Sequence, residues 1–216
     1  DTIVSPVKES DDYKRFALGK SVNRYRLNDV KYIDTSRDGI NYKNESLYDG
    51  AKIMVRKTGV GLYATVDYDV TYGPQVVYIF NFKDETDRSD EWSNYDIEYI
   101  LGVLNSRVML YYYVKEIGDS EWKSFPYVTL TNIRSLPVKR IDWDDEEQVR
   151  IHDEISAKVS ELMENTKPDY VPQNLDDEIE RLVLDLYDLD SDQRKHIWQE
   201  LKDVQDLRII REVMHG

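Results

Sequence analysis

Hydrophobic residues occur at every second position on both sides of the segment Arg56-Lys57-Thr58-Gly59-Val60-Gly61. Before this segment Ile53 and Val55 alternate with Met54, and after it Leu62, Ala64 and Val66 alternate with Tyr63 and Thr65. A period of two is typical of β-strands. Because glycine tolerates positive φ and close approach of another backbone, the two glycines indicate a tight connection. The pattern predicts a β-hairpin over residues 52–65 whose turn carries two cations.

The remaining pattern predicts strands first and helices later. Residues 1–90 contain further strand-like runs around 25–33 and 75–82, separated by Asn, Asp and Gly. A helix is expected from Ser93 or Asn94, because its hydrophobic residues recur at helical spacing: Ile97, Ile100, Leu101, Leu104 and Val108. Gly102 and Ser106 are small, and we expect them to pack closely against the sheet. Residues 125–130 resemble a short strand, and residues 131–138 a turn or single helical turn ended by Pro137.

From Asp144 onward the hydrophobic positions predict three amphipathic helices. The first ends near Asn165, the second is centred on residues 179–186, and the third follows a cap at Asp190 or Ser191. The predicted fold class is mixed α/β (α+β), with a twisted sheet and packed helices followed by a helical C-terminal segment. We place the boundary between two domains at 143/144, giving domains of residues 1–143 and 144–216.

The net charge of −14 is unevenly distributed along the 216 residues. Residues 1–83 carry 13 Lys and Arg against 11 Asp and Glu, a net charge of +2. Residues 84–140 carry 7 against 10, and residues 141–216 carry 9 against 22, which gives −3 and −13. A polyanionic partner would therefore bind the first third, and the acidic last third would face away from it. An acidic, well-solvated helical surface explains the last third equally simply.

Composition excludes several classes of protein. The chain has no Cys, so disulfides and thiol chemistry are excluded. No hydrophobic run approaches the roughly 20 residues that a membrane-spanning helix needs, and the N-terminus lacks the pattern of a signal peptide. We therefore expect a cytoplasmic protein with no membrane partner. The chain begins at Asp1 without Met, which suggests a fragment of a longer polypeptide.

The sequence contains few patterns typical of catalytic sites. The segment 56–61 differs from a nucleotide-binding P-loop, since its glycines follow Lys-Thr and a strand, not a helix, comes next. Glu121-Trp122-Lys123, with Asp96 or Asp119 upstream, has the Glu-x-Lys form of many metal-dependent nucleases, although three-residue matches are common by chance. Asp67 and Asp69 could bind a hard cation, but an exposed turn is the simpler interpretation. The three histidines, His152, His196 and His215, have no second ligand at metal spacing. We therefore predict neither a catalytic residue nor a metal site.

What remains is a candidate binding surface in the strand-rich part. Cations there are interleaved with tyrosines, and such side chains hold phosphates, read base edges and stack on bases. The alternative is that each Tyr is half-buried packing in a β-rich fold. The candidate DNA-binding residues are Arg24, Arg26, Lys52, Arg56, Lys57, Thr58, Gly59, Gly61 and Tyr63.

Four segments in order carry a resemblance to a known family: 19–26 (GKSVNRYR), 52–59 (KIMVRKTG), 99–106 (YILGVLNS) and 132–138 (NIRSLPV). Together they resemble the TaqI-like C-terminal specificity domain of adenine-N6 DNA methyltransferases. This domain also occurs in type IIG restriction–modification enzymes and is akin to the recognition domains of type I specificity subunits. Residues 175–189 resemble the helix that closes many such chains. Many relatives carry Asp after the Gly-Lys, where this chain has Ser21.

The resemblance implies that residues 1–143 recognise double-stranded DNA and that residues 144–216 dock to a catalytic domain. That methyltransferase domain, in the same or a partner chain, would bind S-adenosylmethionine; no cofactor is expected in this chain. We expect no catalytic activity from the chain itself. Two alternatives stay open: an acidic helical module that binds a protein and not DNA, and a metal-dependent nuclease using Glu121 and Lys123.

Overall fold

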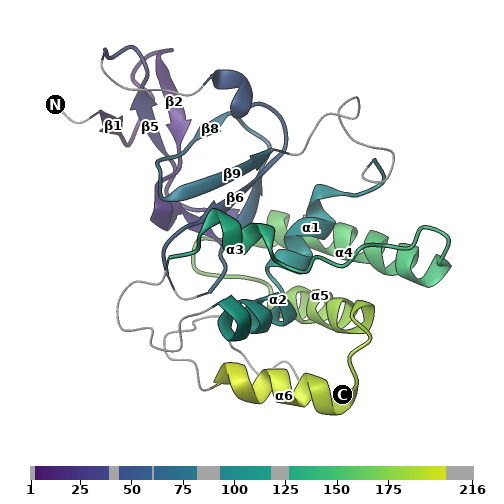
Figure 1. Ribbon diagram of the computed structural model, residues 1–216. Coiled ribbons are helices and arrows are strands. Elements are labelled where there is room, and N and C mark those ends of the chain that lie inside the picture. Colours follow the sequence, from purple (N-terminus) through teal and green to yellow (C-terminus); the bar gives the residue numbers. More distant parts are fainter. Residues whose placement is uncertain (1–2, 39–43, 60, 82–92, 118–126, 203–216) are drawn as a thin grey trace. The chain divides into compact units, whose positions relative to one another are not determined.

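The computed structural model describes residues 3–38, 44–59, 61–81, 93–117 and 127–202. The chain divides into two compact units (Figure 1). Unit 1 comprises residues 1–57 and 63–97, and unit 2 comprises residues 58–62 and 98–216. The predicted α+β class is confirmed, with strands preceding helices along the chain.

Unit 1 contains two larger sheets and a short strand pair. The four-stranded sheet has the order β1 (Val4–Ser5), β5 (Lys31–Asp34), β2 (Tyr13–Phe16) and β8 (Thr71–Tyr72), in which only β2 and β8 run parallel. The antiparallel three-stranded sheet has the order β7 (Ala64–Asp67), β6 (Lys52–Arg56) and β9 (Val77–Asn81). Strands β3 (Val22–Asn23) and β4 (Arg26–Leu27) form the pair. The described part of the unit also contains two 3-10 turns, Gly19–Ser21 and Glu45–Leu47.

Both faces of the central strand β6 are covered, which explains its nearly continuous hydrophobic sequence. Met54 is fully buried and packs with a cluster that includes Val22 and Val77, while Ile53 and Val55 are also buried. A second cluster lies in the four-stranded sheet, where the rings of Tyr48 and Tyr72 stack with centroids 4.1 Å apart. For Tyr48 and Tyr72, packing is therefore the correct interpretation.

Unit 2 is helical in the residues described. Its helices are α1 (Ile97–Leu104), α2 (Arg107–Tyr112), α3 (Leu130–Arg134), α4 (Glu146–Asn165), α5 (Gln173–Leu186) and α6 (Ser191–Lys202), and a π-helical turn, Tyr113–Ile117, extends α2. The predicted end of α4 at Asn165 and the Asp190 cap of α6 are confirmed, since Asp190 accepts hydrogen bonds from the backbone N–H groups of Asp192 and Gln193. Helices α4 and α5 pack along each other, and α2 packs on α5 and α6.

Three predicted elements differ from the structure. The first helix begins at Ile97 and breaks at Ser106, because the Ser106 hydroxyl caps α2 by accepting from the backbone N–H of Met109 at 3.1 Å. Gly102 packs on α4 and α5, not on a sheet: a Cβ added there would lie 2.7 Å from Ile155 Cγ2. The strand expected at 125–130 is wrong in its described part, since Tyr127 makes one isolated bridge and Leu130 begins α3.

The compact units divide near residue 97, whereas the sequence suggested a boundary at 143/144. Helix α1 shares a unit with the C-terminal helices because Gly102 packs against α4 and α5, and α2 packs on α5 and α6. The functional roles assigned to the two domains stay predictions.

Candidate nucleic-acid interface

The hairpin predicted from residue alternation is present. Strands β6 and β7 pair antiparallel, with Ile53 opposite Val66 and Val55 opposite Ala64. The backbone N–H of Arg56 donates to the carbonyl of Tyr63 at 3.0 Å, which closes a loop longer than a two-residue turn. Gly59 and Gly61 have φ angles of 121° and 94°, so the expectation of positive φ at both glycines is confirmed.

Lys52, expected to bind phosphate, is fully buried in the sheet. Its ammonium lies 2.7 Å from Oδ2 of Asp67, the residue directly opposite on β7, and also donates to the carbonyl of Asp69. Its charge is thus satisfied within unit 1. The structure does not present Lys52 to a ligand, and we leave it out of the interface.

The same contacts correct the interpretation of Asp67 as part of an exposed turn. Asp67 is buried and accepts a further hydrogen bond from the Thr71 hydroxyl at 3.1 Å. Asp69 is exposed, and its carboxylate lies 3.1 Å from an Arg15 guanidinium nitrogen. Each aspartate is thus paired with its own basic side chain, which explains both without a metal ion.

A second turn joins the hairpin at the β3–β4 connection. Tyr25 has a left-handed backbone (φ 63°) and a buried ring, and its N–H donates to the carbonyl of Ala64 on β7 at 3.0 Å. This hydrogen bond fixes Arg24 and Arg26, the residues on each side of Tyr25, beside the end of the hairpin. Residues some 30 positions apart in the sequence are thereby brought together.

Three of these cations lie over aromatic rings. The guanidinium carbon of Arg24 is 5.1 Å from the Tyr25 ring centroid, and that of Arg56 is 5.5 Å from the Tyr63 centroid. The Lys57 ammonium is 5.5 Å from the Tyr78 centroid. Such contacts hold a cation in place without neutralising it. We call Arg24, Arg26, Arg56 and Lys57, with Tyr25, Tyr63 and Tyr78, the basic cluster.

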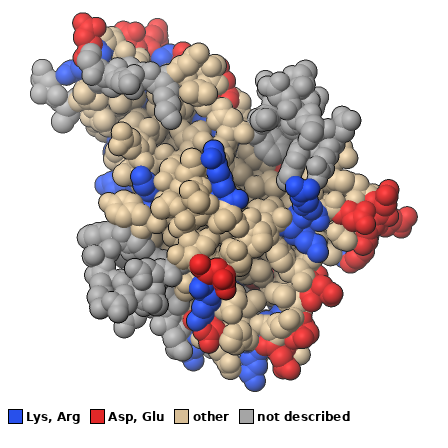
Figure 2. Space-filling model, viewed as in Figure 1, with Lys and Arg blue, Asp and Glu red and all other residues tan. Residues whose placement is uncertain are grey.

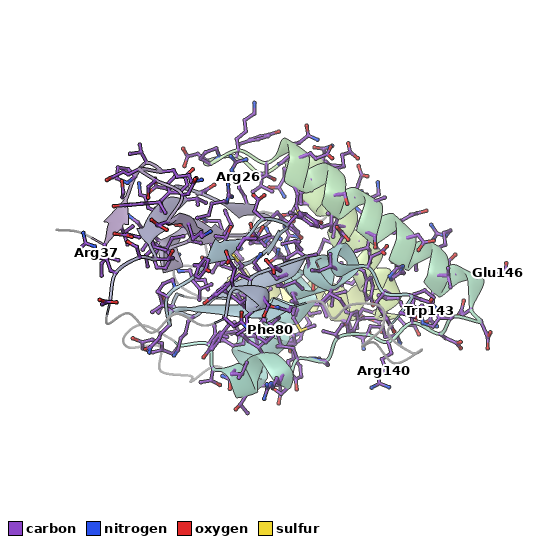
Figure 3. All side chains as sticks on the ribbon, turned by 90° about the horizontal axis from the view of Figure 1, so that it is seen from above. Arg26, Arg37, Phe80, Arg140, Trp143 and Glu146 are labelled. Carbon is purple, nitrogen blue, oxygen red and sulfur yellow. The ribbon has the colours of Figure 1, made fainter. Side chains whose placement is uncertain are left out.

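The four cations of the basic cluster are partly exposed. Elsewhere in unit 1, Arg37 lies 3.1 Å from Asp34, and Lys31 lies 2.7 Å from Asp29. Figure 3 shows Arg26 and Arg37 in different parts of the strand-rich unit. Figure 2 shows Lys and Arg on the visible surface, with acidic side chains beside many of those on the helices.

Sequence reasoning missed Tyr78, since the residue was assigned only to a strand. The missing information is the pairing of β9 with β6: Tyr78 lies opposite Val55, and Lys57 N–H donates to the carbonyl of Val76 at 2.9 Å. This pairing places the Tyr78 ring where Lys57 reaches it.

The rest of the hairpin loop belongs to unit 2. Thr58 forms an isolated antiparallel bridge with Tyr127, Gly61 is buried, and Thr58 and Gly59 are half-buried. A contact of Thr58, Gly59 and Gly61 with DNA stays a prediction.

The nuclease candidate, Glu121 and Lys123 with Asp119, lies outside the described residues, as does His215. His152 is buried, and its ring lies between Tyr99 and Trp143 with centroid distances of 4.7 and 5.1 Å. Its Nδ1 also lies 2.8 Å from Oδ1 of Asp153, and the expectation of no metal site stays a prediction.

The acidic last third is not wholly a solvated surface. Asp176 and Glu180 of α5 are buried around Arg107, with Glu180 Oε2 3.3 Å and Asp176 Oδ2 3.6 Å from its guanidinium nitrogens. Glu180 also accepts from the Arg107 backbone N–H at 2.8 Å. Part of the acidity therefore stabilises the helix packing.

The family described as the TaqI-like C-terminal specificity domain matches residues 14–138, more than half of the chain. The chain belongs to this family. The match begins at β2 and ends after α3, so this specificity domain includes every member of the basic cluster. It extends across both compact units.

A solved structure of the type IIL restriction–modification enzyme MmeI in complex with DNA has a similar fold. The TM-score is 0.52 and the sequence identity 9%, over 90% of this specificity-domain chain. The chain spans about a third (32%) of the MmeI chain. No curated protein matches the sequence. Within the described residues, no helix is both long enough and apolar enough to cross a membrane.

Proposed function

We propose that this chain recognises a specific sequence in double-stranded DNA for a restriction–modification adenine-N6 methyltransferase. The observation that carries the proposal is the basic cluster: two separate turns bring four partly exposed cations to one end of a sheet. Membership of the specificity-domain family and the fold shared with MmeI, a protein solved with DNA, support it.

Placement over tyrosine rings suits these cations to DNA. A guanidinium that contacts a tyrosine ring through its flat face keeps its N–H groups available. These groups lie in the guanidinium plane, so they point past the ring and can still donate hydrogen bonds. Arg56 therefore offers donors to phosphate oxygens or to a guanine edge while its stem is already ordered. Ordering before binding lowers the entropy lost on association.

In this proposal the chain recognises the DNA sequence, and a separate domain catalyses the reaction. A methyltransferase domain, in the same or a partner chain, would supply S-adenosylmethionine and transfer the methyl group. The C-terminal helices would dock to that domain, while the recognition residues position the target. In this proposal the chain itself carries no catalytic group.

Salt-dependent binding tests this function. Counterion release makes the logarithm of the binding constant fall with the logarithm of salt concentration, by a slope of about 0.9 for each phosphate contact. The double variant Arg56→Ala/Lys57→Ala should bind a mixed-sequence duplex more weakly and with a slope smaller by about 2, if both cations contact phosphates.

The matched control is Arg150→Ala on α4. Arg150 is more exposed than Arg56 and Lys57, and it is paired with Glu147 and Glu154. The Arg150→Ala variant should leave both the DNA affinity and the salt slope unchanged. Equal binding and equal slope for the double variant and the wild type would reject the interface.

The alternative function, an acidic helical module that binds a basic protein, makes the opposite prediction. Such a module would not be retained on heparin or DNA at low salt. Burial of Asp176 and Glu180 around Arg107 leaves fewer acids for that role. Retention on heparin, lost in Arg56→Ala/Lys57→Ala, would exclude it.

A further inference from the structure

Tyr127 is a large aromatic residue that the basic cluster does not include. Its side chain is 59% exposed. Large hydrophobic side chains exposed among the described residues are Val7, Leu47, Tyr68, Val76, Tyr127 and Tyr170. Single exposed residues are common on proteins, so exposure alone indicates nothing. The position of Tyr127 distinguishes it.

Tyr127 is held beside the hairpin loop within unit 2. Its backbone forms an antiparallel bridge with Thr58, the residue that directly follows Lys57 in the sequence. Any duplex bound by Lys57 therefore passes close to Thr58. A bridge to Thr58 brings Tyr127 to that same point of the chain.

The neighbours of Tyr127 keep its ring outward. Val128 is fully buried, and successive side chains of an extended segment point to opposite sides. The next residue, Thr129, caps α3 by accepting from the backbone N–H of Asn132 at 3.1 Å. A buried residue and a helix cap thus fix the backbone while the ring faces solvent.

We propose that Tyr127 contacts DNA beside Thr58, with its hydroxyl donating to a phosphate oxygen and its ring against the neighbouring sugar. A phenol suits this position because it combines a hydrogen-bond donor with a flat apolar surface. The inference rests on the proposed function and adds to it a neutral contact outside the basic cluster.

Variants of Tyr127 separate this contact from charge effects. Tyr127→Ala should weaken binding to a mixed-sequence duplex about tenfold, and Tyr127→Phe should weaken it by a smaller factor, because Phe keeps the ring and loses the hydroxyl. Since neither variant changes a charge, the salt slope should equal that of the wild type. Arg56→Ala, in contrast, should lower the slope.

Tyr170 provides a matched control. It is 55% exposed and also forms an isolated antiparallel bridge, with Lys167, in the linker between α4 and α5. Tyr170→Ala should bind like the wild type. Circular dichroism and the unfolding midpoint identify any folding defect in the alanine variants, and Tyr127→Phe, which keeps the ring, tests the contact if Tyr127→Ala is destabilised.

The outcomes distinguish the two proposals. If Arg56→Ala/Lys57→Ala loses affinity but Tyr127→Phe and Tyr127→Ala bind like Tyr170→Ala, the Tyr127 contact is rejected and the proposed function stands. Loss of affinity with an altered salt slope in Tyr127→Phe would also reject a neutral contact. If the wild type binds no duplex at low salt, both proposals fail.

Discussion

The ammonium of Lys52 lies 2.7 Å from Oδ2 of Asp67, and both side chains are buried where β6 pairs with β7. Burying either charge alone is expensive, whereas the pair satisfies both. The ion pair connects β6 to β7 at the end of the hairpin farthest from its loop. It therefore fixes the register that carries Arg56 and Tyr63.

Removing one partner of this pair should destabilise the protein strongly. Lys52→Met leaves the Asp67 carboxylate buried without its cation, and we expect a loss of about 3–5 kcal/mol in the free energy of unfolding. Urea unfolding measures it. The double variant Lys52→Met/Asp67→Leu should recover much of that loss, because no uncompensated charge remains. A double variant as unstable as Lys52→Met would contradict this account.

Substitution of Arg107 in unit 2 should destabilise the protein as strongly as substitution of Lys52. Arg107→Met keeps the aliphatic stem but leaves Asp176 and Glu180 buried without their cation, so we expect a loss of about 3–5 kcal/mol in unfolding free energy. The exposed Arg150→Ala, which breaks two surface ion pairs on α4, should change stability little. Similar unfolding curves for the two variants would show that burial of the acids is unimportant.

Gly102 should not tolerate a methyl group. A Cβ there would lie 2.7 Å from Ile155 Cγ2 and 3.0 Å from Val159 Cγ2, both on buried side chains of α4. Overpacking of this kind costs about 1–3 kcal/mol, which should exceed the roughly 1 kcal/mol that Ala gains over Gly in a helix. Thermal unfolding of Gly102→Ala tests this. Because Ile155→Ala removes the nearest methyl, the penalty should shrink in that background.

Arg24 and Arg26 should act together with the hairpin although they are distant in sequence. Arg24→Ala/Arg26→Ala should lower both DNA affinity and its salt slope, since each lost phosphate contact reduces counterion release. Arg37→Ala serves as the control, because Arg37 pairs with Asp34 in another part of unit 1. If Arg37→Ala reduces the salt slope as much as Arg24→Ala/Arg26→Ala, DNA binding depends on the net charge of the protein and not on the basic cluster.

Asp145 makes the stability of α4 depend on pH. The side-chain amide of Gln148, then the backbone N–H groups of Gln148 and Glu147, hold the pKa of the Asp145 carboxyl below its usual value. The carboxylate's contribution is therefore complete above the pKa of an unfolded Asp. It is lost as the pH falls through the lower, folded pKa.

Asp145→Asn isolates this effect. Asparagine still caps the helix but does not titrate, so the stability difference between wild type and variant should shrink as the pH falls below the usual pKa of Asp. The measurement is the unfolding midpoint against pH for both proteins. A constant difference over that range would exclude Asp145 as the titrating group.

The sequence alone determined the elements whose signals are local. Alternation around the 56–61 segment predicted the hairpin, and its glycines predicted positive φ. Helical spacing predicted α4 and its end near Asn165, and the cap at Asp190 or Ser191 predicted the start of α6. These follow from nearby residues, because strand and helix periodicities and caps are properties of a few consecutive positions.

The tertiary structure decided what each charged residue does. Lys52 and Arg56 stand four positions apart on one strand, yet Lys52 is buried against Asp67 and Arg56 lies over Tyr63 at the surface. Gly102 was expected to pack against a sheet, but it packs against α4. Arg24 joins Arg56 through a backbone hydrogen bond from Tyr25 to Ala64. Such facts depend on which distant segments meet, and no local pattern encodes the burial or the counter-charge that results.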